Sequence, residues 1–276
     1  MSRKKKIVVY LVVLAFILGL LSWQQNNALS VSDYEMASAE VPVEADGFRI
    51  VQLSDLHNKS FGLNQVRLVS KVEKLKPDII VITGDIVDAR RYDPEPALIL
   101  VKQLQSLAQV YYVNGNHESD VPTYPEFEQR MIQSGVRVLR NEREVLFDGQ
   151  EKIAIIGIDD PTFMATSGFV TRLNSLSDGF EGFKILLSHR PERFETYVDQ
   201  GYDLIFSGHA HGGQIRLPFF GGVIAPHQGF FPMYDAGEFE REGAKLIVNR
   251  GLGNSLFPQR IFNTPEIVLM ILKHKE

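Results

Sequence analysis

The chain has 276 residues, of which 44% are hydrophobic and 23% are charged, and these proportions are close to those of soluble globular domains. They exclude a disordered chain, a collagen and a multi-span membrane protein. Lys and Arg number 29 against 34 Asp and Glu, so the basic excess typical of nucleic-acid-binding proteins is lacking and no nucleic acid partner is expected. Cysteine is absent, which excludes disulfides, cysteine-ligated zinc and a thiol nucleophile.

The N-terminus has the pattern of a membrane-targeting segment. Arg3 and the lysines at 4–6 precede 17 uncharged residues at 7–23. This length reaches the lower end of the ~17–25 residues of a spanning helix and exceeds the ~7–15 residues of a signal-peptide core. We therefore expect residues 1–23 to form an uncleaved anchor. The alternative is a signal cleaved near Ala37-Ser38-Ala39. Because the basic end stays in the cytoplasm, we expect a single-pass cell-membrane protein with the remaining residues on the extracytoplasmic side.

The remainder of the chain predicts an α/β domain. Residues 24–32 are polar and predict a short linker, and 33–276 predict one domain. Apolar runs that predict buried strands cover 48–53, 79–82, 110–113, 153–156, 185–187, 204–206, 246–248 and 267–272. Apolar residues three or four positions apart predict helices around 63–75, around 97–108 and after Pro191. This alternation is typical of sheets covered by helices on both faces.

Polar clusters follow five of the predicted strands, at the strand ends where α/β sheets bind ligands. They contain five of the seven histidines. The mixture of carboxylate, imidazole and amide groups suits a divalent ion such as Mn, Fe, Zn or Co. Seven candidate ligands are too many for one tetrahedral zinc, whereas two ions that share one carboxylate would use all seven, and a metal pair is a known clamp for phosphoryl groups. The clusters predict a dinuclear hydrolase and are Ser54-Asp55-Leu56-His57, Gly84-Asp85-Ile86-Val87-Asp88, Gly115-Asn116-His117-Glu118, Ser188-His189 and Gly208-His209-Ala210-His211.

These motifs, in this order over residues 54–211, resemble the calcineurin-like metallophosphoesterase superfamily. The resemblance implies a four-layer α/β/β/α sandwich with the site at its edge, preceded here by the N-terminal transmembrane helix. The segments at 208–214, 249–254 and 265–267 resemble a bacterial envelope-associated, YkuE- and YaeI-like branch. That branch is similar to enzymes that cleave UDP-2,3-diacylglucosamine.

The resemblance also implies roles for individual residues. His117 would protonate the leaving oxygen, and Asp88 would hydrogen-bond His117 and hold its charged form. The nucleophile would be a hydroxide that bridges the metals. Asp88 as a helix-start acid and Asn116 as a turn residue remain alternatives, and Glu118 is assigned no site role. The implied metal ligands are Asp55, His57 and His211 for the first ion, Asn116, His189 and His209 for the second, and Asp85 between them.

The expected function is therefore metal-dependent hydrolysis of a phosphodiester or pyrophosphate in the cell envelope, on a small phosphoester or lipid-linked substrate. A phosphomonoesterase or phosphoprotein phosphatase, and a non-catalytic metal-binding scaffold, are the alternatives. No protein partner is implied. Phe219, Phe220, Phe230, Phe231 and Met233 follow the last candidate ligands. They predict either a small hydrophobic subcore or an apolar lip for a lipid substrate.

Overall fold

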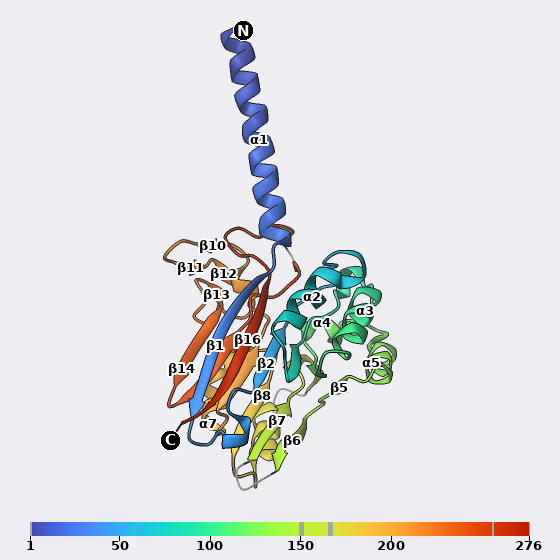
Figure 1. Cartoon of the computed structure of the whole chain (residues 1–276), viewed down its shortest axis with the longest axis vertical. Helices are drawn as coiled ribbons and strands as arrows, with labels where there is room; N and C mark the ends of the chain where they lie inside the picture. The colour runs from blue at the N-terminus through green and yellow to red at the C-terminus, as the bar shows by residue number, and fades with distance from the viewer. Residues whose placement is uncertain (1, 149–151, 165–167, 256, 276) are drawn as a thin grey trace.

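Two sheets form the centre of the molecule (Figure 1). The computed structural model describes residues 2–148, 152–164, 168–255 and 257–275. Over these residues each main sheet has six strands. The first sheet has the order β1 (Ser30–Ser38), β16 (Glu266–His274), β2 (Arg49–Leu53), β3 (Ile79–Thr83), β4 (Gln109–Val113) and β5 (Arg137–Val138). The second has the order β14 (Gly237–Arg241), β15 (Ala244–Val248), β9 (Leu204–Ser207), β8 (Phe183–Leu187), β7 (Lys152–Gly157) and β6 (Glu142–Asp148).

Alternation of side chains along each strand divides the core into layers. In β3, Ile79 and Val81 pack into the cluster shared by the two sheets, whereas Ile80 and Ile82 point to the opposite face, as successive strand residues must. Helices cover both outer faces, so the predicted four-layer α/β/β/α sandwich is confirmed. The covering helices are α2 (Val66–Lys74), α3 (Glu95–Leu104) and α5 (Tyr124–Gln133) on the first sheet, and α6 (Phe169–Ser177) and α7 (Phe194–Asp199) on the second.

The N-terminal helix rises from one end of this sandwich (Figure 1). It is α1 (Arg3–Asn27), and none of its residues is buried. Among the described residues, α1 is the one helix that is long and apolar enough to cross a membrane. Its last turns contact the loop around residue 260, where the Ser22 hydroxyl donates to Gln259 Oε1 at 2.6 Å.

The junction between anchor and domain differs from the prediction. The sequence predicts a linker over 24–32, but α1 continues to Asn27 and β1 begins at Ser30. The nine residues of β1 pair in parallel with β16. Ala37-Ser38-Ala39, the alternative cleavage site, lies at the end of this strand, so cleavage there would remove β1 and expose the edge of β16.

Smaller elements carry the remaining loops. The short helix α4 (Asn116–Ser119) follows β4, and the 3-10 turn η1 (Val43–Ala45) lies at the end of the domain far from α1 (Figure 1). Two small hairpins lie at the α1 end and are formed by β10 (Arg216–Leu217), β11 (Gly221–Gly222), β12 (Ile224–Ala225) and β13 (Gly229–Phe230).

Candidate metal centre

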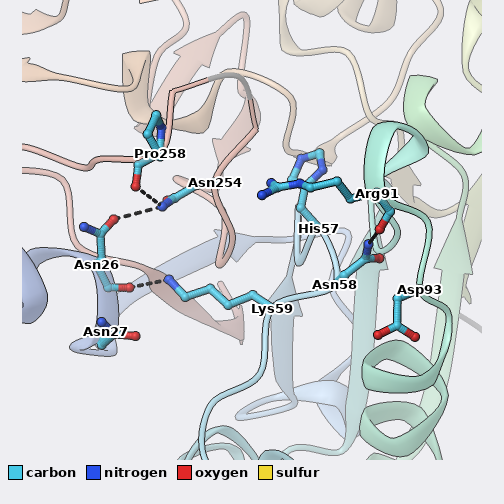
Figure 2. Close-up of a pocket in the computed structure, with 9 residues that line it drawn as sticks. All are labelled: Asn26, Asn27, His57, Asn58, Lys59, Arg91, Asp93, Asn254 and Pro258. Atoms are coloured by element: carbon cyan, nitrogen blue, oxygen red, sulfur yellow. Dashed lines mark hydrogen bonds between the residues drawn. The ribbon is translucent and has the colours of Figure 1, made fainter.

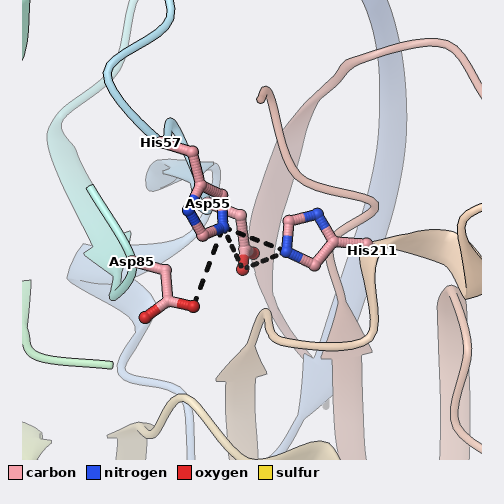
Figure 3. A group of neighbouring side chains, drawn as sticks. All are labelled: Asp55, His57, Asp85 and His211. Carbon is pink, nitrogen blue, oxygen red and sulfur yellow. Dashed lines mark hydrogen bonds and ion pairs between the residues drawn. The ribbon is translucent and has the colours of Figure 1, made fainter. Parts of the chain in front are cut away.

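The strand ends bring the predicted ligands together. β2, β3 and β4 are parallel neighbours in one sheet, and β8 and β9 are parallel neighbours in the other. Ligand atoms of Asp55, His57, Asp85 and His211 lie within 4.8 Å of one another (Figure 3). Those of Asp85, His189 and His209 form a second such group. Asp85 belongs to both groups, which is the arrangement that a shared carboxylate requires.

The potential ligand atoms in these groups lie closer together than their own hydrogen bonds explain, as if arranged around a cation. His57 Nε2 lies 3.1 Å from His211 Nε2, and His189 Nε2 lies 3.3 Å from Asp85 Oδ2. His189 Nδ1 donates to the Thr83 carbonyl at 2.7 Å, so Nε2 is the nitrogen that faces the carboxylate and becomes a ligand once it loses its proton. Asn116 Oδ1 is buried and accepts no hydrogen bond from any of the described residues. Convergent imidazole, carboxylate and amide lone pairs of this kind fit divalent metal ions.

Burial sets the protonation of the histidines. It lowers the pKa of His57 to about 3 and holds those of His209 and His211 well below the usual value. These rings are therefore neutral, the form that ligates metal. His189 differs, because although burial lowers its pKa, the charge of Asp85 raises it to about 10. A divalent ion at that position would take the place of this proton.

The ligand loops have unusual backbone conformations. Five of the seven predicted ligands have positive φ angles, between 46° and 66°. Such left-handed conformations are uncommon for residues other than glycine and cost on the order of 1 kcal/mol or more each. Hydrogen bonds between loops hold them, for example from the His57 N–H to the Asp85 carbonyl at 3.1 Å. The residues are Asp55, His57, Asp85, His209 and His211.

Two glycines allow these loops to approach one another. A Cβ at Gly115 would collide with the Asp85 carboxylate, and one at Gly208 would collide with Ser54 and Asp55. Only glycine fits at position 208, because the backbone passes directly beside a candidate ligand.

His117 lies at the rim of the cluster. Its ring packs edge-on against that of His57 with 4.5 Å between centroids. The Ala89 N–H donates to His117 Nδ1 at 3.2 Å, so the ring proton is carried on Nε2. The predicted hydrogen bond between His117 and Asp88 is not formed, because Asp88 Oδ1 lies 3.6 Å from His117 Nδ1 and accepts instead from the Arg90 N–H at 2.9 Å. Asp88 instead holds the turn beside His117, where its carboxylate also pairs with Arg91 at 3.3 Å.

The cluster opens into a pocket beside the anchor helix (Figure 2). His57 and Lys59 line one side, and Asn26 and Asn27, the last residues of α1, line another. Asn254 Nδ2 donates to Asn26 Oδ1 at 2.9 Å, and the Lys59 ammonium donates to the Asn26 carbonyl. The remaining lining residues are Asn58, Arg91, Asp93, Asn254 and Pro258.

Comparison with known proteins agrees with this geometry. The profile of the family described as Calcineurin-like phosphoesterase matches residues 48–213. The chain belongs to the calcineurin-like phosphoesterase family. It is 33% identical to the uncharacterized metallophosphoesterase YkuE of Bacillus subtilis, over 92% of this chain and 89% of YkuE. It is 26% identical to phosphodiesterase YaeI of Escherichia coli, over 82% of each chain.

Solved structures add support for the fold. The crystal structure of a dimetal phosphatase from Danio rerio matches with a TM-score of 0.50 and 13% identity, over 75% of this chain and 88% of that one. Family membership makes this chain a metal-dependent phosphoester hydrolase, as the sequence predicts. The family and the buried Asp and His cluster together indicate divalent metal ions at the site.

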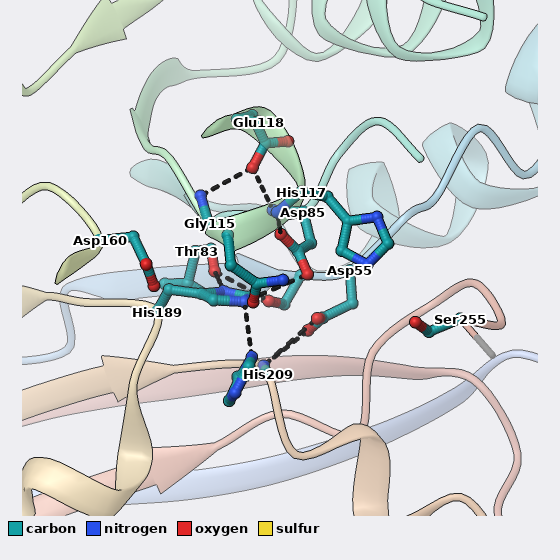
Figure 4. Close-up of polar contacts among 12 residues, drawn as sticks. Asp55, Thr83, Asp85, Gly115, His117, Glu118, Asp160, His189, His209 and Ser255 are labelled. Atoms are coloured by element: carbon teal, nitrogen blue, oxygen red, sulfur yellow. Dashed lines mark hydrogen bonds and ion pairs between the residues drawn. The ribbon is translucent and has the colours of Figure 1, made fainter. Parts of the chain in front are cut away.

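Sequence reasoning missed the role of Glu118 in this phosphoesterase site. Its fully buried carboxylate accepts backbone N–H bonds from Asp85 at 2.9 Å and from Gly115 at 2.7 Å (Figure 4). It also accepts from Ile86 and Val87, at 2.8 and 3.2 Å. Glu118 therefore ties the loop after β3 to the loop after β4 and fixes the position of Asp85.

Glu118→Gln should weaken metal binding without removing a predicted ligand. The amide nitrogen of Gln cannot accept the N–H bonds that one carboxylate oxygen accepts, so the Asp85 loop shifts. Loss of such support costs about 10–100-fold in metal affinity. Calorimetric titration with Mn²⁺ measures this, with Glu126→Gln on the exposed face of α5 as the matched control. Equal affinities of the two variants would contradict the assigned role.

Arg190 is a second residue that sequence reasoning passed over. It is buried and forms paired hydrogen bonds with Asp160, at 2.5 and 2.9 Å. The Asp160 carboxylate is buried as well. Arg190 Nη1 also lies 3.0 Å from His209 Nε2 and 2.7 Å from His227 Nδ1. The Arg190–Asp160 pair thus supports the outer side of the second ligand group. The one feature of the sequence that points to this role is the position of Arg190 directly after His189.

Proposed function

We propose that this phosphoesterase hydrolyses a phosphodiester or pyrophosphate bond in a substrate displayed at the membrane surface of the cell envelope. The observation that carries the proposal is the position of the pocket, which leads to His57 and is bounded by Asn26 and Asn27 at the end of α1. Because α1 is long and apolar enough to span a membrane, it would hold the pocket mouth close to the bilayer.

The proposed centre holds two divalent ions. Such ions polarise phosphoryl oxygens and lower the pKa of bound water. The seven ligands would be divided as Asp55, His57 and His211 for one ion, Asn116, His189 and His209 for the other, and Asp85 shared. This division is supported by the two groups of converging ligand atoms and by the undonated oxygen of Asn116.

Other side chains supply binding and proton transfer. Arg91 lines the pocket, where its positive charge would offset the negative charge of the phosphoryl group. Lys59 also lines it, and because burial lowers the pKa of this amine to about 7, it would serve mainly as a hydrogen-bond donor. His117 would act on the leaving oxygen, through the proton that the Ala89 contact places on Nε2. Arg90 Nη2 lies 3.4 Å from this atom and would also meet a bound phosphate.

Relatives support the preference for diesters and the membrane location. YaeI, to which this chain is similar, is named a phosphodiesterase. A Danio rerio relative, 28% identical over 88% of this chain and 57% of its own length, is named a transmembrane protein with a metallophosphoesterase domain. Arg3 and the lysines at 4–6 precede the apolar run, and the basic end of such a helix stays in the cytoplasm. The catalytic domain would thus be extracytoplasmic.

Full-length protein in detergent, stripped of metal and reloaded with Mn²⁺, should cleave bis-p-nitrophenyl phosphate faster than p-nitrophenyl phosphate. Chelation should abolish both reactions and Mn²⁺ should restore them, because ion binding is required. Faster cleavage of the monoester would overturn the diester assignment in favour of a phosphatase. Failure to cleave either ester, with no stoichiometric metal bound, would favour the scaffold.

A further inference from the structure

Large apolar side chains are exposed at the end of the domain from which α1 emerges. The hydrophobic subcore considered from the sequence is not formed. Phe219, Phe220, Phe230 and Phe231 lie on or beside the two small hairpins and have exposed fractions between 62% and 104%. Phe262, in the loop that contacts α1, is 64% exposed. Together with Leu217, these residues form what is called here the phenylalanine surface.

The phenylalanine surface is continuous with the anchor helix. Phe262 lines one hollow with Leu217 and Phe219 and another with Leu18 and Leu21 of α1. The Arg216 N–H donates to the Ile261 carbonyl at 3.0 Å, which fixes the first hairpin to this loop. The hairpin therefore cannot move away from the helix without breaking these contacts.

The contacts between the phenylalanine surface and α1 set the depth at which this surface would lie in a membrane. Leu18 lies five residues before Trp23, the last residue before the polar stretch that begins at Gln24, and five residues span about 7.5 Å along a helix. Helices that lie in the membrane interface bury their apolar faces by about 5–10 Å. Phe262 thus lies at a level where a spanning α1 would be surrounded by the headgroup and acyl boundary.

The charge on the hairpin is compatible with lipid. Residues 217–224 carry no ionisable side chain. Arg216, at the base of the hairpin, is paired with Asp235 at 3.0 Å. Immersing the tip therefore does not require an unpaired charge to leave water, which would be costly.

We propose that the phenylalanine surface inserts into the bilayer beside α1 and forms a second membrane contact of the catalytic domain. The inference rests on the proposed anchoring by α1 and goes beyond it. A helix alone would leave the domain free to tilt, whereas two contacts fix the side of the domain that faces the lipid. Asn26 and Asn27 border the pocket at this same end, so the pocket mouth would be held at a constant height above the bilayer.

Because the chain has no cysteine, single cysteines report on each surface in the full-length protein. Phe220→Cys labels the phenylalanine surface, Val43→Cys labels an exposed apolar position far from α1, and Leu14→Cys labels the helix itself. Each variant is coupled to the fluorophore NBD and reconstituted into phosphatidylcholine–phosphatidylglycerol vesicles with and without doxyl-labelled lipid. Quenching at position 220 should be several-fold stronger than at 43, and comparable with that at 14.

A second variant separates insertion from mere proximity. Phe219→Asp/Phe231→Asp in the Phe220→Cys background should reduce lipid quenching at 220 to the level at 43. It should leave Mn²⁺-dependent cleavage of bis-p-nitrophenyl phosphate unchanged, because none of these residues touches the metal centre. That activity also confirms that the variant is folded.

The outcomes distinguish this inference from the proposed anchoring and function. Quenching at 14 but not at 220 would overturn the inference and leave the anchor in place. Quenching at 220 alone would contradict the anchor and, with it, a second contact beside α1, and quenching at neither position would overturn both. NBD that is shielded at 220 without lipid quenching would indicate a second copy of the chain on this surface and would overturn the inference. Activity on the soluble diester is measured separately and tests the proposed function alone.

Discussion

Asp85→Asn is expected to reduce hydrolysis to the level of the chelated protein and to lower metal binding at both ligand groups. Asp85 Oδ2 lies 3.7 Å from His57 Nε2 and 3.3 Å from His189 Nε2, so one carboxylate serves both. Its Oδ1 accepts from the His117 N–H at 2.8 Å. Asn keeps the shape but removes the negative charge and presents an NH₂ group on one side. The measurement is metal content by mass spectrometry together with diester cleavage.

Asp93→Asn is the matched control for this variant. Asp93 is exposed and lies at the rim of the same pocket, outside both ligand groups (Figure 2). The Asp93→Asn variant should retain both its metal content and its rate of diester cleavage. If Asp85→Asn bound as much metal and reacted as fast as Asp93→Asn, the shared-ligand assignment would be wrong.

His117→Ala is expected to lower turnover by roughly 10²–10⁴, the usual contribution of a positioned proton donor. Metal content should not change, because His117 belongs to neither ligand group. The loss should be larger for an alkyl leaving group than for p-nitrophenol, since a poor leaving group depends more on proton transfer. Rates on paired diesters with these two leaving groups provide the measurement.

His274→Ala, at the far end of β16, controls for the loss of an imidazole. Equal losses on good and poor leaving groups would indicate that His117 binds the phosphoryl group rather than the leaving oxygen. A variant with full activity on the poor leaving group would remove His117 from the mechanism.

The strands and candidate ligands could be predicted from the sequence because they depend on local patterns. Buried strands such as β3 and β9 are continuous apolar runs, and the residues after parallel strands must meet at one edge of a sheet. The strands β6 and β14 were not predicted, since both lie at sheet edges. The β14 side chains are largely exposed, and edge strands need few apolar residues.

The supporting contacts of the site were beyond sequence reasoning. Glu118 accepts from backbone groups more than thirty positions away, and nothing in the spacing of residues identifies such a partner. Asp88 shows the converse case. Its place in the motif suggested a hydrogen bond to His117, but the Ala89 N–H from the same turn occupies that nitrogen.

The junction of α1 and β1 has a mechanical consequence. Only Ala28 and Leu29 separate the helix from the strand, and β1 is hydrogen-bonded to β16 along its nine residues. A pull on the helix along its axis would therefore be transmitted to the domain as shear across the whole β1–β16 ladder, in which the hydrogen bonds share the force instead of opening one by one. The domain would follow the motion of its anchor as a rigid body.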